Sequence, residues 1–468
     1  MHKDHISVFA TEAMRTAENR EEMLQAIKNA SGLTVDILSP GMESLFGAMG
    51  ARSDFTQVNG LFMDLGGGSV QMTYVDSTTG SGYYMLAAEA AKSMPFGAAK
   101  LAAALSTQST ADAAKAELGA SMKETFEGLK VRFPGLKEQA EHDEGITIYF
   151  CGGGFRGYGN MLMHTDPIQP YPISSIGGYT VPGHRFVKWR EMLHENGYEK
   201  GKIHGMSKRR REQFPAIVTV VQSLVETIPK IKEVNFCSGG NREGVLYMKL
   251  PPEIREENPL ALLPSGLPGQ KSEITASIAA CIASALPRGY PPVFSTELLN
   301  YVARNVWQNM GDLDDANSAE ALHDPISGQL AGLPGMTHQI RAIIALTMCA
   351  RWGVNPSPVD KRLHENLQAL IGMEMSWWCE YIGTVAEFLA TVSPAFPSSG
   401  DALSKIVKFE TWTGHGLGKK GHKVGIRVKI TLSEDARRGV RAGDLEGTFG
   451  RVGKSLSLGW KVEAEVEN

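Results

Sequence analysis

Residues 61–75, LFMDLGGGSVQMTYV, decide the fold expected for the first half of this chain. An apolar run that contains Asp64 is followed by three glycines at 66–68 and by Ser69. A second strand-like run begins after this turn. Glycine has no Cβ atom, so the backbone N–H groups of such a turn can approach and converge on an anion. The stretch therefore indicates either a phosphate-binding turn, with Asp64 holding a metal ion or orienting water, or an ordinary tight hairpin.

The bulk composition is that of a globular protein with more than one domain. The 468 residues are 42% hydrophobic and 21% charged, and a chain of this length is expected to form about two to four domains. The net charge of −4 gives no global basic field, so direct DNA binding is not expected.

Cysteine usage and hydropathy point to a soluble intracellular protein. The five cysteines are scattered, odd in number and form no CxxC pair, which suits a reducing compartment. The histidines form no HExxH and no His-Asp metal motif, so the sequence predicts no zinc site. No apolar run reaches the roughly 18 residues that span a bilayer, and the N-terminus has no signal-peptide core. We therefore expect a cytoplasmic location and no membrane association.

Strands alternate with helices over the first 250 residues, which predicts an α/β sheet. The expected strands, besides the glycine hairpin, are Ile6–Ala10, Thr34–Leu38, a strand near Gly82–Leu86, Ile146–Phe150 and Val234–Cys237. The expected helices are Glu12–Asn29, Glu43–Met49, Ala98–Arg132, Val181–Asn196 and Arg209–Thr227. Glycine turns follow strands at 64–69, 151–154 and 238–244. Because ligands of such sheets bind at strand ends, the three turns are expected to line one cleft.

The second half has a different character. Prolines from 251 to 268 open a region that is largely helical from 272 to 392, and a Pro/Ser/Gly stretch at 394–400 ends it. The tail predicts a small β unit with strands at Lys405–Glu410, Lys423–Leu432 and Leu456–Val466. The expected domains are therefore 1–56, 57–250, 251–400 and 401–468.

Six segments in colinear order resemble the exopolyphosphatase/guanosine-pentaphosphate phosphatase (Ppx/GppA) family. They are VFATEAMRTAENR (8–20), ILSPGMESLFGAMG (37–50), MDLGGGSVQ (63–71), SMPFGAAKL (93–101), FCGGGFRGYG (150–159) and SGGNREGVLY (238–247). The resemblance implies an α/β, actin-like and sugar-kinase-like (ribonuclease H-like) phosphatase core. In this chain the first domain of that core is incomplete, and a mainly helical domain and a small β-rich C-terminal unit follow it.

The resemblance also implies a site and a reaction. Water would attack a terminal phosphoanhydride of polyphosphate or of a guanosine penta- or tetraphosphate with help from Mg²⁺. Glu43 would be the general base, Asp64 would be catalytic and lie near Mg²⁺, and Gln71 would stand beside the metal. The implied phosphate-binding residues are Gly66, Gly67, Gly68, Ser69, Gly152, Gly153, Gly154, Gly239 and Gly240.

Departures from the family pattern remove charge from this site. Gln71 replaces a glutamate of the family pattern. In the "EEAR" segment the second glutamate is kept as Glu43, but Met42 replaces the first glutamate and Leu45 replaces the arginine. The aspartate of "SDGG" has no counterpart before Gly239. The family's first phosphate loop, "DxGSNS", has no counterpart upstream, so we expect either an N-terminal truncation or a protein that cannot clamp phosphate from both sides. The first two strands would then have unpaired edges, so we expect aggregation or a homodimer.

The whole pattern resembles a fungal branch of the family that acts in retrograde regulation. Residues 345–354 lack the His-Asp pair of an HD-type domain, so a helical remnant without metal is expected. Two functions remain open. One is a retrograde (mitochondria-to-nucleus or nitrogen-status) regulator that binds polyphosphate or guanine nucleotide phosphates and signalling proteins, with weak or lost hydrolysis. The other is an active Mg²⁺-dependent phosphohydrolase that uses Glu43 as its base.

Several other features have more than one interpretation. The basic run 208–211 predicts a solvated helix start, a cationic rim for a polyanion or a nuclear-import patch. Arg15 is expected to pack or pair within its helix, or to face phosphate. Packing roles are expected for Cys151 and for the tryptophans at 352, 377 and 378. Arg242 and Glu243 are expected to form an internal ion pair at a helix start, and 416–421 a hairpin tip.

Overall fold

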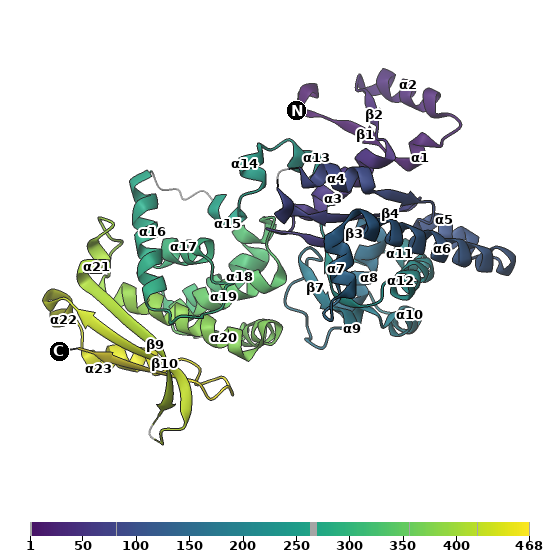
Figure 1. The fold of residues 1–468 in the computed structure, drawn as a ribbon. Helices are drawn as coiled ribbons and strands as arrows, with labels where there is room; N and C mark the ends of the chain where they lie inside the picture. The colour runs from purple at the N-terminus through teal and green to yellow at the C-terminus, as the bar shows by residue number, and fades with distance from the viewer. Residues whose placement is uncertain (1, 81, 263–268, 355, 419, 468) are drawn as a thin grey trace. The chain divides into compact units, whose positions relative to one another are not determined.

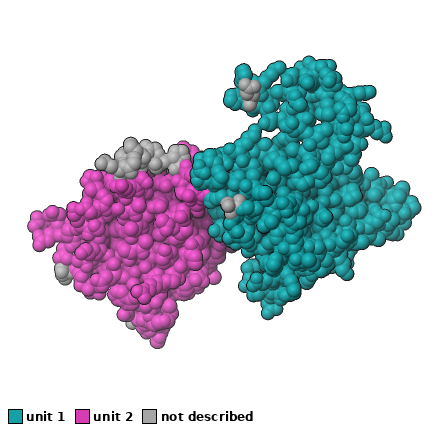
Figure 2. All heavy atoms as spheres, turned by 45° about the horizontal axis from the view of Figure 1, so that its top comes forward, with its two compact units in different colours: residues 1–167, 174–256 teal, residues 168–173, 257–468 magenta. Residues whose placement is uncertain are grey.

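The computed structural model describes residues 2–80, 82–262, 269–354, 356–418 and 420–467. The chain divides into two compact units (Figure 2). The first unit contains residues 1–167 and 174–256, and the second contains residues 168–173 and 257–468. The predicted division into four domains stays a prediction.

A six-stranded mixed sheet forms the centre of the first unit (Figure 1). Its strand order is β5-β4-β3-β6-β8-β7. The strands are β3 (Asn59–Leu65), β4 (Val70–Asp76), β5 (Lys92–Met94), β6 (Ile146–Cys151), β7 (Tyr179–Pro182) and β8 (Ile231–Phe236). β3, β6 and β8 run parallel, whereas β4, β5 and β7 pair antiparallel. The parallel strands end at one edge, and each is followed by a glycine turn.

Apolar side chains at alternate positions along each strand cover the two faces of this sheet. On one face Phe62 and Tyr149 join a buried cluster with residues of the helices at 40–52 and 83–90. On the other face Phe150 stacks on Phe155 with ring centroids 4.0 Å apart. Because successive side chains of a strand point to opposite faces and both faces are covered, apolar residues stand at adjacent positions in the central strands, as at 61–63 and 148–150.

The described residues of the first unit also form sixteen helical segments. They are η1 (Lys3–His5), α1 (Glu12–Arg15), α2 (Arg20–Ser31), α3 (Pro40–Arg52), η2 (Ser77–Thr79), α4 (Tyr83–Ala90), α5 (Ala98–Ala104), α6 (Gln108–Arg132), α7 (Pro134–Glu141), α8 (Gly152–His164), α9 (Gly183–Phe186), α10 (Trp189–Tyr198), α11 (Lys208–Glu212), α12 (Phe214–Thr227), α13 (Asn241–Met248) and α14 (Pro252–Arg255). Ser39 caps α3 by accepting the Met42 N–H at 3.3 Å. Glycines let α3 touch the start of α13, since a Cβ on Gly50 would lie 2.2 Å from the Gly240 carbonyl oxygen.

The N-terminal strands form a small sheet of their own. β1 (Val8–Ala10) pairs in parallel with β2 (Val35–Ile37), and among the described residues neither has another strand neighbour. Within residues 5–42 no side chain is buried, and Glu43 is the first buried residue after this stretch. The predicted unpaired edges are therefore confirmed for the described residues, while aggregation or a homodimer stays a prediction.

Several predicted elements differ from the structure, and the predicted helices 98–132 and 209–227 are each divided in two, into α5 and α6 and into α11 and α12. The helix predicted over 12–29 is broken into α1 and α2 around Thr16–Asn19. The strand predicted near 82–86 is wrong, because α4 buries Tyr83, Ala87 and Ala90 on a helical period of three to four residues. The helix predicted from 181 begins too early, because Tyr179 and Val181 are buried on a two-residue period in β7.

The second unit is a helical array followed by a β unit, as predicted. Its helices are α15 (Pro259–Leu262), α16 (Gly269–Ser284), α17 (Thr296–Asn305), α18 (Asp314–Ser327), η3 (Gln329–Gly332), α19 (His338–Arg351), α20 (Lys361–Val392), α21 (Ala402–Ile406), α22 (Glu434–Gly439) and α23 (Ala442–Phe449). β10 (Lys423–Leu432) lies between β9 (Val407–Leu417), which is antiparallel to it, and β11 (Lys461–Val466), which is parallel.

The packing roles of the tryptophans are confirmed. Trp377 is fully buried and stacks on Tyr381 with centroids 5.7 Å apart, and Trp352 and Trp378 are also buried. The glycine-lysine stretch at 416–421 connects β9 to β10, which confirms a hairpin tip except at residue 419, which lies outside the described residues. In the described parts of the chain, no helix is both long and apolar enough to cross a membrane.

Candidate functional site

The first glycine turn, residues 66–69, closes the β3–β4 hairpin. Leu65 pairs with Val70, and the Gly66 N–H donates to the Ser69 carbonyl at 3.0 Å. Among the described residues no acceptor is found for the N–H groups of Gly67, Gly68 and Ser69. Three N–H groups without internal partners are what an anion-binding turn requires.

The N-terminal end of α5 forms hydrogen bonds with the carbonyl groups of this turn. The N–H groups of Ala98 and Ala99 donate to the carbonyls of Gly66 and Gly67 at 2.9 and 3.0 Å. Only glycine fits at position 97, because a Cβ there would lie 2.3 Å from the Ser69 nitrogen. The carbonyl groups of the turn are thereby fixed on the α5 side.

Asp64 lies directly before this turn and faces the second one. A Cβ on Gly152 would lie 2.2 Å from Asp64 Oδ1, so only glycine leaves room for the carboxylate there. Burial raises the pKa of Asp64 to about 6, Arg156 partly opposes this rise, and Glu43 adds to it. A cation beside Asp64 would offset the free-energy cost of ionising it.

Glu43, Gln71 and Ser69 form a connected group next to Asp64. The Gln71 amide, opposite Asp64 in the strand register, donates to Ser69 Oγ at 2.8 Å and to Glu43 Oε1 at 3.4 Å. Arg15 donates to Glu43 Oε2 at 2.6 Å. The structure therefore brings the predicted catalytic and metal residues together, although their chemical roles stay predictions. Pairing of Arg15 within its own helix is wrong, because its partner lies 28 residues away.

Glu12 is a residue of this site that sequence reasoning missed. A Cβ on Gly68 would lie 2.2 Å from Glu12 Oε2, so this carboxylate lies against the glycine turn. Lys100 pairs with its other oxygen at 2.5 Å. No sequence spacing signals this contact, because α1 reaches the turn only through the tertiary fold.

The second glycine turn starts α8, and two arginines lie on it. Gly152 has a φ of +82°, and no side chain caps the helix at Cys151. The Arg210 guanidinium approaches Gly153, and burial together with the nearby charge of Arg156 lowers the pKa of Arg210. Two cations and an uncapped helix start favour an anion at this position.

The basic run 208–211 is divided by this arrangement. Arg210 lies across α8, whereas Lys208 and Arg209 are exposed to solvent. Arg211 instead donates to the Asn196 carbonyl at 2.7 Å. Only one of the four side chains therefore reaches the glycine turns.

The third glycine turn is occupied by the protein's own carboxylates. The N–H groups of Ser238 and Gly239 donate to Asp54 Oδ2 at 2.5 and 3.1 Å. The Gly240 N–H donates to Glu243 at 2.8 Å, so Glu243 caps α13 where an ion pair with Arg242 was expected. Phosphate binding at Gly239 and Gly240 stays a prediction, and it would require these carboxylates to move away.

The three turns lie at the same edge of the sheet. Asp64 pairs with Cys151 across β3 and β6, and the Cys237 N–H donates to the Phe150 carbonyl across β6 and β8. Arg156 joins the second turn to the third by donating to the Ser238 carbonyl at 2.9 Å. Cys151 is fully buried, and burial raises the pKa of its thiol, which confirms its packing role.

A separate group in the first unit has the side chains of a metal site. His164, Glu195 and Glu199 present ligand atoms within 4.8 Å of one another. His164 ends α8, whereas Glu195 and Glu199 lie at the C-terminal end of α10, more than 30 positions further along the chain. No local spacing in the sequence therefore signals that the histidine joins the two carboxylates.

The sequence matches two known families. Residues 1–253 match the Ppx/GppA phosphatase family, and residues 265–466 match the RTG2 C-terminal domain. Among curated proteins, Retrograde regulation protein 2 of Saccharomyces cerevisiae is 29% identical over 409 residues, which cover 83% of this chain and 67% of the yeast protein.

Solved structures give weaker similarities. A Ppx/GppA phosphatase of Aquifex aeolicus is 20% identical with a TM-score of 0.37, over 52% of this chain and 75% of that one. An exopolyphosphatase of Cytophaga hutchinsonii is 18% identical with a TM-score of 0.38, over 52% of this chain and 74% of that one.

Proposed function

The chain belongs to the Ppx/GppA phosphatase family, and we propose that it is a phosphate-binding regulator in which hydrolysis is weak or lost. Polyphosphate or guanine nucleotide phosphates would bind at the glycine turn 66–69. The protein would act in the cytoplasm with signalling proteins of a retrograde pathway. The observation that carries the proposal is a turn with three open N–H groups beside a glutamate that is already hydrogen-bonded through both oxygens.

Phosphate binding is supported by the donors that converge on one sheet edge. The open N–H groups of residues 67–69 lie beside the uncapped start of α8. Arg156 and Arg210 add two positive charges there, and guanidinium groups can bind phosphate oxygens in pairs. Lys100, at the start of α5, would become available to an anion that displaces Glu12.

Weak hydrolysis is supported by what surrounds Glu43. A general base needs a free lone pair directed at the attacking water. Arg15 holds one carboxylate oxygen of Glu43, and the Gln71 amide contacts the other. Gln71 also brings no negative charge, and an amide is a weaker Mg²⁺ ligand than a carboxylate.

The residues present fit a Mg²⁺ ion in part. Asp64 supplies one half-buried carboxylate whose ionisation is costly without a cation. Mg²⁺ is commonly held by one or two carboxylates together with substrate phosphates, so Asp64 with the phosphate would be sufficient, with Gln71 as a neutral neighbour. When bound, the ion would neutralise charge on the phosphate oxygens.

The regulatory role is supported by the extent of the similarity to the yeast protein. The matched stretch covers 83% of this chain, so it reaches into both units. The helical and β-rich second unit matches a domain that is named after that protein. A role in retrograde signalling is therefore the proposal that accounts for both halves of the chain.

An active phosphohydrolase is the second candidate. It is favoured by one observation: Gln71, the strand partner of Asp64, donates to Glu43 Oε1 at 3.4 Å, so both carboxylates lie beside the open turn. Rotation of Arg15 away from Glu43 would release one carboxylate oxygen for the attacking water.

Binding and hydrolysis can be tested separately. Tripolyphosphate binding to the full chain would be measured by calorimetry with and without Mg²⁺. We expect Arg210→Met to weaken tripolyphosphate binding about tenfold, because one charge-assisted contact is lost. The control is Arg209→Met, at an exposed neighbouring position, which should leave the affinity unchanged. Equal effects of the two variants, or no binding by the wild type, would refute the proposed site.

Hydrolysis would be followed as phosphate release from polyphosphate with Mg²⁺. We expect little release, and no change in Glu43→Gln. Rapid release that disappears in Glu43→Gln but persists in the exposed control Glu117→Gln would establish the second candidate in place of the first.

A further inference from the structure

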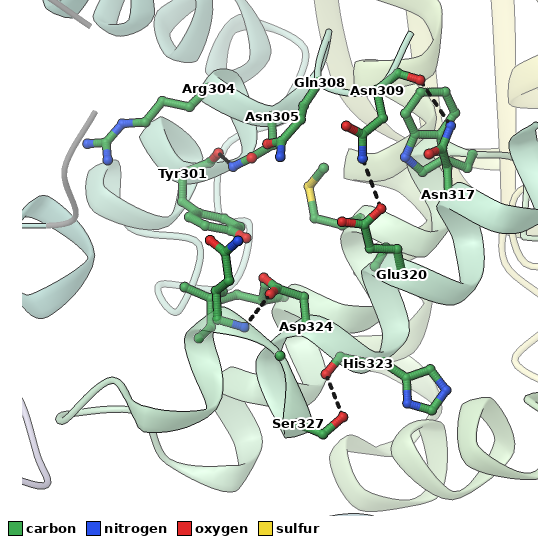
Figure 3. Close-up of a pocket in the computed structure, with 17 residues that line it drawn as sticks. Tyr301, Arg304, Asn305, Gln308, Asn309, Asn317, Glu320, His323, Asp324 and Ser327 are labelled. Carbon is green, nitrogen blue, oxygen red and sulfur yellow. Dashed lines mark hydrogen bonds between the residues drawn. The ribbon is translucent and has the colours of Figure 1, made fainter. Parts of the chain in front are cut away.

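The second unit contains a cavity that the phosphate site does not explain. It has a volume of about 790 Å³ and lies between α17, α18 and the side of α19 (Figure 3). Cavities of roughly 300–1,000 Å³ are the size that holds small molecules. All of its lining residues belong to the second unit, so it is independent of the glycine turns.

The floor of the cavity is apolar. Leu330, Ile344 and Met348 contribute to it and are 5%, 1% and 7% exposed. The half-buried ring of Tyr301 from α17 forms part of the wall. A ligand with some hydrocarbon or planar surface would therefore be covered on that side.

The rim carries two carboxylates without a cationic partner. Glu320 and Asp324 lie one turn apart on α18, and neither takes part in an ion pair within the described chain (Figure 3). Glu320 Oε2 accepts a hydrogen bond from the Asn309 amide at 2.9 Å, and Asp324 Oδ1 accepts from the Gln329 N–H at 2.8 Å. Both donors are neutral, so the negative charge of the two side chains is not compensated by them.

The basic residues of the lining do not supply that compensation. The guanidinium of Arg304 points away from Glu320 and Asp324 in Figure 3. His323 contacts Asp360 at 2.8 Å through its Nε2 atom. An anionic ligand such as a nucleotide would therefore meet like charge at this rim, whereas a cation would meet two acceptors.

We propose that this cavity binds a small organic cation with N–H donors, of the guanidinium or alkylamine class. The charged head would lie between Glu320 and Asp324, and each carboxylate would accept charge-assisted hydrogen bonds. The ring of Tyr301 offers an aromatic face to the same head, and the alkyl part would cover the apolar floor. The carboxamides of Asn305 and Gln308 complete the polar rim.

A matched pair of ligands isolates the charge. n-Butylguanidinium and n-butylurea have nearly the same shape and hydrogen-bonding plane, but only the first is a cation. Calorimetry on the full chain at low ionic strength would compare them, because salt screens exposed charges. We expect saturable one-to-one binding of n-butylguanidinium and at least about tenfold weaker binding of n-butylurea.

Isosteric variants assign the binding to this cavity. Glu320→Gln and Asp324→Asn keep the hydrogen bonds seen here and remove one charge each, so each should weaken n-butylguanidinium binding about tenfold. Glu365→Gln, an exposed carboxylate on α20 with 58% of its side chain accessible, is the control and should bind as the wild type does.

Each contrary result overturns the proposal. Equal binding of the two ligands would mean that charge is not recognised. No saturable binding at millimolar ligand, or equal losses in Glu365→Gln, would mean that the cavity is not the site. If a variant fails to fold, the comparison of the two ligands on the wild type still decides.

Discussion

Substitution of Asp64 by asparagine should stabilise the first unit at neutral pH. Burial raises the pKa of this carboxyl from 3.8 to about 6, so the ionised form costs free energy that an amide of the same shape avoids. At about 1.4 kcal/mol for each tenfold change in proton affinity, the full cost is about 3 kcal/mol. The side chain is half-buried and keeps some solvation, so we expect Asp64→Asn to gain about 1–2 kcal/mol at pH 7.5.

The sign of the pH dependence follows from the raised pKa. Between the unfolded value near 3.8 and the folded value near 6, the folded state binds more protons than the unfolded state. The cost is therefore present in full above about pH 6, and it is relieved as the pH falls toward 4. The wild type should lose its disadvantage against Asp64→Asn over that window, because a protonated Asp64 is neutral.

Hydrogen exchange in urea gives the required free energies. Peptides that cover β3 and β6 report the opening of the first unit without contributions from the second. The two proteins would be compared at pH 7.5 and pH 4.5, with and without Mg²⁺. Mg²⁺ should stabilise the wild type and leave Asp64→Asn unchanged.

A less stable Asp64→Asn at pH 7.5 would refute this reasoning. So would an advantage that is as large at pH 4.5 as at pH 7.5, because the effect would then not come from ionisation. Stabilisation of both proteins by Mg²⁺ would place the ion elsewhere.

Three further substitutions, with Gly128→Ala on α6 as a control, test the surroundings of the glycine turn. Gly97→Ala should destabilise the first unit by about 3 kcal/mol, because its Cβ would lie 2.3 Å from the backbone of the turn. Gly128→Ala is the control: this glycine faces open space on α6, and in the same urea titration its replacement should stabilise the first unit by about 0.5–1 kcal/mol. Arg15→Met should cost about 2 kcal/mol because it leaves the buried Glu43 carboxylate without its cation, and an unchanged unfolding free energy would contradict this ion pair. Glu12→Gln should tighten tripolyphosphate binding about fivefold in calorimetry, since it removes a negative charge from the turn, and weaker binding would show that Glu12 does not oppose the anion.

Local sequence patterns predicted most elements of the first unit. The hairpin around the glycines and the strand at 146–150 were predicted because their apolar and glycine residues act over a few positions. The segment at 82–86 was predicted wrongly because a short apolar run fits a strand or a helix equally well. Packing of Tyr83 and Ala87 on the sheet decided that it is a helix.

The sequence by itself determined the family, the α/β class of the first unit and the glycine turns at the strand ends, because these depend on residue types at short spacing. Only the tertiary structure decided which groups meet at those turns. Arg15 reaches Glu43, Glu12 lies on Gly68, and Asp54 occupies the third turn. Each of these contacts joins residues that are tens to hundreds of positions apart. Such distances in the chain carry no local signal, and only the tertiary fold brings these charged groups together at the sheet edge.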